Sequence, residues 1–248
     1  MRVVEFLGAP GSGKTTLAGE LARSFPGAVD LEGAVRTSIG ARGEDAMAQT
    51  AARISRSSSS RMWRAAYARS TDRFSGLTRF VGANPEFMRT ILDGQHSRAD
   101  RDRGQDLVLG WLLNLMARYQ LAIEWARAEW LVVDEGFCQR GVALFSHGFD
   151  PSDRPHLDSY LSSMPQPDAV VVVDTPPQIA EARLESRGWS ERVRDLPLEE
   201  RRAFLAGAGE VTRAIADHLD TAGTPVIWVD GTTPVADSLR VVAATLPS

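Results

Sequence analysis

The stretch that decides the fold is Gly8-Ala9-Pro10-Gly11-Ser12-Gly13-Lys14-Thr15. It matches the pattern G-x-x-x-x-G-K-[ST] at every fixed position. An apolar, β-rich run precedes it at 2–7, and a helix-forming stretch follows it at 14–23. Glycines let such a loop turn its backbone N–H groups onto phosphate oxygens, and the N-terminus of the following helix adds partial positive charge. The sequence therefore predicts a strand, a phosphate-binding loop and a helix, in that order.

The polar side chains of this loop predict its ligands. Lys14 is the one lysine among 28 basic residues, and all the others are arginine. Its compact ammonium suits the β- and γ-phosphates of a nucleotide, where a planar guanidinium is a poor replacement. Thr15 would place its hydroxyl on a Mg²⁺ ion that bridges those phosphates. We therefore expect ATP and Mg²⁺ as cofactors, bound by Gly8, Ala9, Pro10, Gly11, Ser12, Gly13, Lys14, Thr15 and Thr16.

Four further runs predict strands, at 28–31, 129–134, 169–174 and 225–230. Uninterrupted β-branched runs such as 169–174 suit parallel strands that are covered on both faces. Helix-forming stretches at 176–187 and 199–220 lie between the last two of these strands, and another at 234–246 follows the last one. This alternation predicts an α/β fold with a five-stranded parallel sheet and helices on both faces. Because no clean linker or repeat is present, we expect residues 1–248 to form a single domain.

A long region between the second and third predicted strands, about 33–128, has no strand pattern. It is rich in alanine, arginine and leucine, which indicates several helices. The clearest of these is expected at about 104–128, where apolar residues recur near the 3.6-residue period. Ser57–Ser60 is expected to separate two helices, and Pro85 to begin another.

Two adjacent carboxylates end the predicted strand at 129–134. Parallel strands of open α/β sheets deliver their C-terminal residues to the ligand crevice, so Asp134 is expected to face the phosphate loop and bind Mg²⁺. Glu135 is then either a general base or a ligand of the substrate. An ATPase would use such a glutamate to orient water, and a kinase would use it to accept a proton from the substrate hydroxyl. The pair alone does not choose between these roles.

The phosphate loop resembles that of the P-loop NTPases, and a later stretch resembles one branch of them. Val173-Asp174-Thr175-Pro176-Pro177 begins a helix that ends in Arg183-x-x-x-Arg187-Gly188, which is similar to the start of the lid in thymidylate and nucleoside kinases. The resemblance implies a lid at about 183–199, in which Arg183 and Arg187 act in catalysis and Arg187 also contacts the nucleotide. It also implies that the strand ending at Asp134 lies between the first two strands, and that 33–128 forms a helical cap that supplies the acceptor pocket.

Five residues are candidates for binding the acceptor. Asp30, Glu32 and Arg36 follow the second predicted strand, at the edge of the crevice. Arg98 belongs to a polar cluster between helices. Arg140 follows Asp134 as an arginine does in nucleoside and thymidylate kinases, although the spacing is longer here.

Composition narrows the class of partner. The formal net charge of −4 argues against a dedicated nucleic-acid binder, and no apolar run is long enough to cross a membrane. The single cysteine, Cys138, cannot form an internal disulfide, which favours the cytoplasm. We expect an ATP- and Mg²⁺-dependent kinase that phosphorylates a hydroxyl or phosphate of a small soluble acceptor, with a homodimer left open.

The alternative is a P-loop ATPase that hydrolyses ATP to drive a conformational change. The sequence does not name the acceptor, because a nucleoside, a nucleotide, a sugar precursor and an antibiotic would each suit a carboxylate base and arginine-rich surroundings.

Overall fold

A computed structural model describes residues 1–55, 60–98 and 105–246. Its sheet contains β1 (Arg2–Leu7), β2 (Ala28–Asp30), β3 (Trp130–Val133), β4 (Ala169–Asp174) and β5 (Val226–Asp230). The strands are all parallel and lie in the order β2-β3-β1-β4-β5. The predicted five-stranded parallel sheet is confirmed, and so is the position of β3 between β1 and β2. Glu5 of β1 is in register with Val133 of β3 and with Val170 of β4.

Helices cover both faces of the sheet because successive strand residues point to opposite sides. Val4 and Phe6 of β1 pack on one face, against α1 (Lys14–Ser24) and α12 (Val235–Thr245). Val3 and Leu7 pack on the other face, in a larger core. The helices of that second face include α8 (Phe137–Phe145), α9 (Arg154–Ser163) and α11 (Leu198–Thr221). The result is the three-layer arrangement that the sequence predicts.

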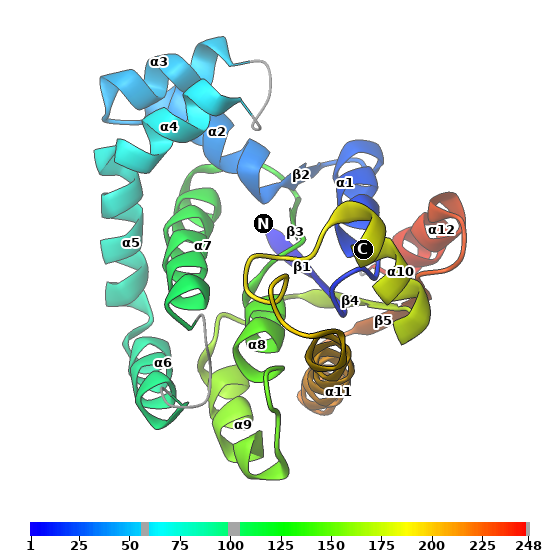
Figure 1. The fold of residues 1–248 in the computed structure, drawn as a ribbon. Helices are drawn as coiled ribbons and strands as arrows, with labels where there is room; N and C mark the ends of the chain where they lie inside the picture. Colours follow the sequence, from blue (N-terminus) through cyan, green and yellow to red (C-terminus); the bar gives the residue numbers. More distant parts are fainter. Residues whose placement is uncertain (56–59, 99–104, 247–248) are drawn as a thin grey trace.

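The region between β2 and β3 is helical, as predicted. It comprises α2 (Leu31–Arg42), α3 (Ala46–Ile54), α4 (Arg61–Arg69), α5 (Thr71–Ala83), α6 (Pro85–Arg98) and α7 (Gln105–Trp125). Figure 1 shows α3 to α6 on the outer side of α7, away from the sheet. Phe80 of α5 and Phe87 of α6 are fully buried and join this layer to Phe137 of α8, with ring centroids 5.5 Å from each to Phe137. The helical layer is thereby anchored on the element that directly follows β3.

Element boundaries differ from the predictions by one to three residues, and the reasons are local. Leu31 begins α2 instead of ending β2, because the Asp30 carboxylate accepts the Gly33 N–H and caps the helix. Pro85 does begin α6, as expected. The segment proposed as a break at 57–60 lies almost entirely outside the described residues, and Ser60 caps α4. The sequence analysis did not identify α8 and α9, which fill the connection between β3 and β4.

The helix α10 (Pro177–Arg187) follows β4. It ends before Gly188, whose φ of 99° is reached most easily by glycine. Among the described residues, no helix combines the length and the apolar character needed to cross a membrane.

Candidate active site

The phosphate-binding loop occupies the C-terminal end of β1, at the centre of the sheet. Gly11 and Gly13 have φ values of 83° and 98°, which side-chain-bearing residues rarely adopt, and α1 begins directly afterwards at Lys14. Two side chains from other elements hold the loop. The Gly8 N–H donates to Gln139 Oε1 of α8 at 3.1 Å, and the Thr175 hydroxyl donates to the Ser12 carbonyl at 3.0 Å.

Arg183 contacts the backbone of this loop. Its guanidinium donates to the carbonyls of Gly11 and Ser12, at 3.2 and 3.1 Å, and to the carbonyl of Gly231 at 2.9 Å. These bonds join the loop to the turn after β5. The Arg183 guanidinium is thus hydrogen-bonded to three carbonyls. The catalytic role that the resemblance implies for Arg183 stays a prediction.

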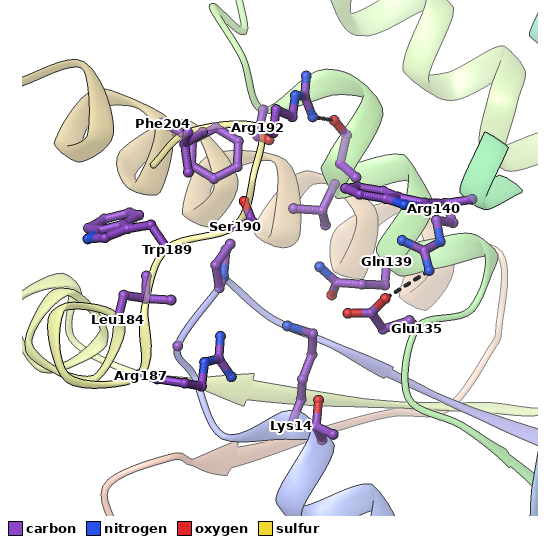
Figure 2. Close-up of a pocket in the computed structure, with 18 of the residues that line it drawn as sticks. Lys14, Glu135, Gln139, Arg140, Leu184, Arg187, Trp189, Ser190, Arg192 and Phe204 are labelled. Carbon is purple, nitrogen blue, oxygen red and sulfur yellow. Dashed lines mark hydrogen bonds and ion pairs between the residues drawn. The ribbon is translucent and has the colours of Figure 1, made fainter. Parts of the chain in front are cut away.

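A cavity of about 360 Å³ opens above the loop, and we call it the central cavity. Figure 2 shows Lys14, Arg187 and Glu135 pointing into it. Lys14 is 7% exposed and makes no hydrogen bond or ion pair with the described residues. Burial lowers the pKa of its ammonium, while the carboxylates of Glu135 and Asp134 act in the opposite direction. The loop therefore presents a buried, unpaired cation to the cavity, together with the Arg187 guanidinium.

The two predicted metal ligands lie next to one another. Asp134 follows β3, and the Thr15 side chain lies beside its carboxyl group. Burial raises the pKa of Asp134, the neighbouring Glu135 raises it further, and Lys14 and Thr15 lower it. A hydroxyl and a carboxylate are oxygen ligands of the kind that Mg²⁺ takes, with phosphate and water oxygens completing its shell. The residues present therefore fit a Mg²⁺ ion.

Glu135 lies at the outer wall of the central cavity, at the turn between β3 and α8. Its carboxylate pairs with the Arg140 guanidinium at 2.8 Å, which in turn lies 5.4 Å from the centroid of the Trp111 ring. Trp111 comes from α7, so the ion pair joins the strand end to the helical layer. The Glu135 side chain is half exposed, whereas Arg140 is largely buried. A carboxylate that is both exposed and oriented can accept a proton from a bound hydroxyl.

A buried carboxylate underlies this turn. Glu5 of β1 is 1% exposed and accepts the backbone N–H groups of Phe137 and Cys138, at 3.0 and 2.8 Å. Burial raises its pKa, and the two backbone hydrogen bonds lower it in part. Gly136 allows the carboxylate to approach, since a Cβ at that position would lie 2.2 Å from Glu5 Cδ. Glu5 therefore fixes the first turn of α8 to the central strand.

A second cavity of about 470 Å³, here called the edge cavity, lies beside the ends of β2 and β3. It shares Thr15, Trp111, Glu135 and Arg140 with the central cavity. Its remaining polar wall includes Asp30 and Glu32 from the start of α2, and Asn114 and Arg118 from α7. Glu32 pairs with Arg118 at 2.5 Å. The Glu135–Arg140 pair therefore lies in the wall that two neighbouring cavities share, one above the loop and one under the helices.

The candidate acceptor residues separate into three groups. Asp30, Glu32 and Arg140 line the edge cavity. Arg36 does not line it, because its guanidinium donates to the carbonyls of Ala52 and Ser55 and supports the end of α3. The Arg98 side chain lies outside the described residues.

A third cavity of about 740 Å³, the outer cavity, lies on the other side of the loop. Gly11, Gly13, Thr16 and Arg187 line both this cavity and the central one. Its far walls come from α10 and from the turn after β5, including Ile179, Gly231 and Thr233. The predicted lid segment also contains Arg192 and Arg194, and of its arginines Arg183, Arg187, Arg192 and Arg194 only Arg187 borders both cavities. Arg192 donates to the Ala143 carbonyl, and Arg194 pairs with Asp195 at the surface.

Several residues of the site were not identified from the sequence. Gln139, Arg118 and Trp111 belong to no motif that the sequence analysis used. Glu5 carried an unused signal, because a single carboxylate within the apolar run at 2–7 requires a buried partner.

Comparison with known proteins relates the chain by structure alone. No protein-family model and no curated protein sequence matches it. A structure of deoxyadenosine kinase from M. mycoides with bound dATP matches with a TM-score of 0.54 and 12% sequence identity, over 100% of both chains. A second structure of that enzyme, with products dCMP and dCDP, matches with a TM-score of 0.53 and 13% identity, over 98% of both chains. The chain therefore has the fold of deoxynucleoside kinases, a P-loop α/β fold.

Proposed function

We propose that this protein is an ATP- and Mg²⁺-dependent kinase that phosphorylates a hydroxyl of a small acceptor. One observation carries the proposal: Glu135 lies between the central cavity above the phosphate loop and the separate edge cavity under the helical layer. Such a neighbouring second space suits an acceptor molecule, whereas hydrolysis requires room only for water. The fold shared with a deoxynucleoside kinase supports a phosphotransferase.

The donor would occupy the outer and central cavities. Its base would lie near Ile179, Gly231 and Thr233, and its phosphates on the loop near Lys14. Lys14 and Arg187 would neutralise the charge that spreads over the oxygens of the transferring phosphoryl group. Thr15 and Asp134 would hold Mg²⁺, which when bound supplies charge neutralisation between the phosphates.

The acceptor would occupy the edge cavity with one hydroxyl directed at Glu135. The carboxylate would take the proton of that hydroxyl while the hydroxyl oxygen forms a bond to the γ-phosphorus of ATP. The bond between the γ-phosphorus and the bridging oxygen breaks, and that oxygen leaves with ADP. Arg140 holds the carboxylate by the ion pair and so fixes its direction. The acceptor oxygen would then be held close to the γ-phosphorus in an orientation suited to attack.

Charge in the edge cavity favours an acceptor that carries no phosphate. Among the described residues that line it, the basic side chains are Arg118 and Arg140, and each is already paired with a carboxylate. Asp30 and Asp134 add two further acidic groups. A phosphorylated acceptor would have to break an existing ion pair, and a neutral or amine-bearing hydroxyl compound would not.

The test is acceptor-dependent ADP release over a panel of nucleosides, sugars and hydroxyl-bearing antibiotics, each run beside its monophosphate where one exists. We expect slow ATP turnover alone, strong stimulation by an unphosphorylated compound, and a product heavier by one phosphate in mass spectrometry. In Glu135→Gln, the stimulated kcat should fall with little change in the Kd of ATP. Rapid ATP hydrolysis that no small compound stimulates, and that a protein or nucleic acid modulates, would instead establish the ATPase alternative.

A further inference from the structure

Gln139 is the one buried polar side chain of α8 that faces the phosphate loop. It is 7% exposed, lies in the first turn of the helix, and lines the central cavity with Lys14 and Glu135. Figure 2 shows its amide at the inner end of the side chain, directed into the cavity. Its side chain has two functional ends, an acceptor oxygen and an NH₂ group with two donors.

The orientation of this amide is fixed by the loop. The Gly8 backbone N–H can only donate, so the atom that it meets at 3.1 Å must be the amide oxygen Oε1. Nε2 therefore points away from Gly8. Among the residues that the structure describes, no acceptor lies within hydrogen-bond distance of Nε2. The side chain is largely buried and lines the central cavity, so an oxygen of a ligand bound there can accept from Nε2.

The surroundings identify the ligand. Lys14 is buried and unpaired in the same cavity, and Arg187 borders it from the opposite side. Cations and unfilled N–H donors that converge on one space suit oxygens that carry negative charge. Glu135 forms the outer wall of this cavity, and its carboxylate would repel a second anionic group placed beside it. The phosphoryl group in transfer between the loop and Glu135 is the anionic species that this space would hold.

On the basis of the proposed function, we propose that Gln139 is a catalytic residue that donates from Nε2 to an oxygen of the transferring phosphoryl group. Its Oε1 keeps the loop in place through Gly8, and its Nε2 stabilises the group in transit. Because both ends belong to one side chain, the loop and the transferring phosphoryl group would be held at a fixed distance from each other. Removing a single preorganised donor of this kind lowers rates by roughly 10²- to 10³-fold.

The test compares the binding of ADP with that of ADP plus aluminium fluoride and Mg²⁺, which mimics the phosphoryl group in transfer. In Gln139→Met, affinity for the aluminium fluoride complex should fall by about 100-fold while affinity for ADP changes by less than about threefold. Gln139→Glu keeps an oxygen for Gly8 but loses the donor, so it should show the same selective loss. Thr175→Val is the matched control, because it removes another side-chain hydrogen bond to the loop, from a residue that does not line the central cavity.

The outcomes separate the two roles. A parallel loss of ADP and aluminium fluoride affinity in Gln139→Met, equal to that in Thr175→Val, would show that Gln139 only supports the loop. Wild-type affinity for the aluminium fluoride complex in both Gln139 variants would also overturn the inference. A wild-type protein that fails to bind ADP would refute the proposed function itself, and this inference with it.

Discussion

Gly136 is the position at which the smallest substitution should disturb the site most. Its φ and ψ of −79° and −165° are accessible to alanine, so the backbone itself does not require glycine. The obstacle is Glu5: an added Cβ would lie 2.2 Å from Cδ and 2.4 Å from both carboxylate oxygens. Since Glu5 is on the central strand, it cannot withdraw without leaving the Phe137 and Cys138 N–H groups.

The cost follows from those two bonds. A hydrogen bond to a charged group contributes about 1.5–3 kcal/mol, so losing both should lower the free energy of unfolding by about 3–6 kcal/mol in Gly136→Ala. That is a large share of the roughly 5–15 kcal/mol that stabilises an ordinary domain. Gly110→Ala is the matched control, because no atom lies within 4 Å of its added Cβ in the interior of α7. It should stabilise the protein by about 0.5–1 kcal/mol.

Urea unfolding followed by circular dichroism measures both variants. Glu5→Ala provides the internal check, since it should cost several kcal/mol in the wild-type background and far less in Gly136→Ala, where the same bonds are already lost. Equal stability of Gly136→Ala and wild type, or strictly additive effects of the two substitutions, would refute the account of Glu5 as the support of α8.

Three further predictions concern the charged groups. Lys14→Ala should abolish turnover, and Lys14→Arg should restore little of it, because a planar guanidinium replaces a point charge in a buried position; full activity in a steady-state ADP assay would count against the phosphate loop. Arg187→Ala should lower the acceptor-stimulated rate far more than the affinity for ATP measured by calorimetry, since its charge acts mainly on the transferring group. The raised pKa of Glu5 means that the folded protein binds this proton more tightly than the unfolded chain. Wild type should therefore gain stability relative to Glu5→Gln as the pH falls from above the folded pKa towards 4.5, and an unchanged difference would contradict the shift.

The sequence was sufficient for the features that depend on short stretches. The loop at 8–15, the runs of β-branched residues and the helix-forming stretches each carry their own local signal. The order of the strands came from the resemblance to nucleoside and thymidylate kinases, because periodicity does not say which strands pair. The helices α8 and α9 were not predicted, although the stretch Phe137–Phe145 is largely apolar.

The partners of the charged residues could not be predicted, because they are set by contacts between distant segments. Glu32 meets Arg118 across 86 residues, and Glu5 meets the backbone of Phe137 across 132. Arg36 was placed at the crevice and turned instead to the end of α3, where two carbonyls lacked donors. In each case the residue type indicated that a partner was needed, and only the fold showed which one.

The first turn of α8 is hydrogen-bonded both to Glu5 and to Gly8, and this has a consequence for the exchange of its backbone amides with solvent. Helix N-termini usually fray, because their first N–H groups have no partner within the helix. Here Glu5 of the central strand accepts two of those N–H groups, and Gln139 of the same turn accepts the Gly8 N–H. Opening of this turn therefore requires separation from the central strand, which belongs to the global unfolding unit. The amides of Phe137 and Cys138 should exchange as slowly as those inside β1, so the end of the sheet that carries the phosphate loop should be among the slowest-exchanging parts of the molecule.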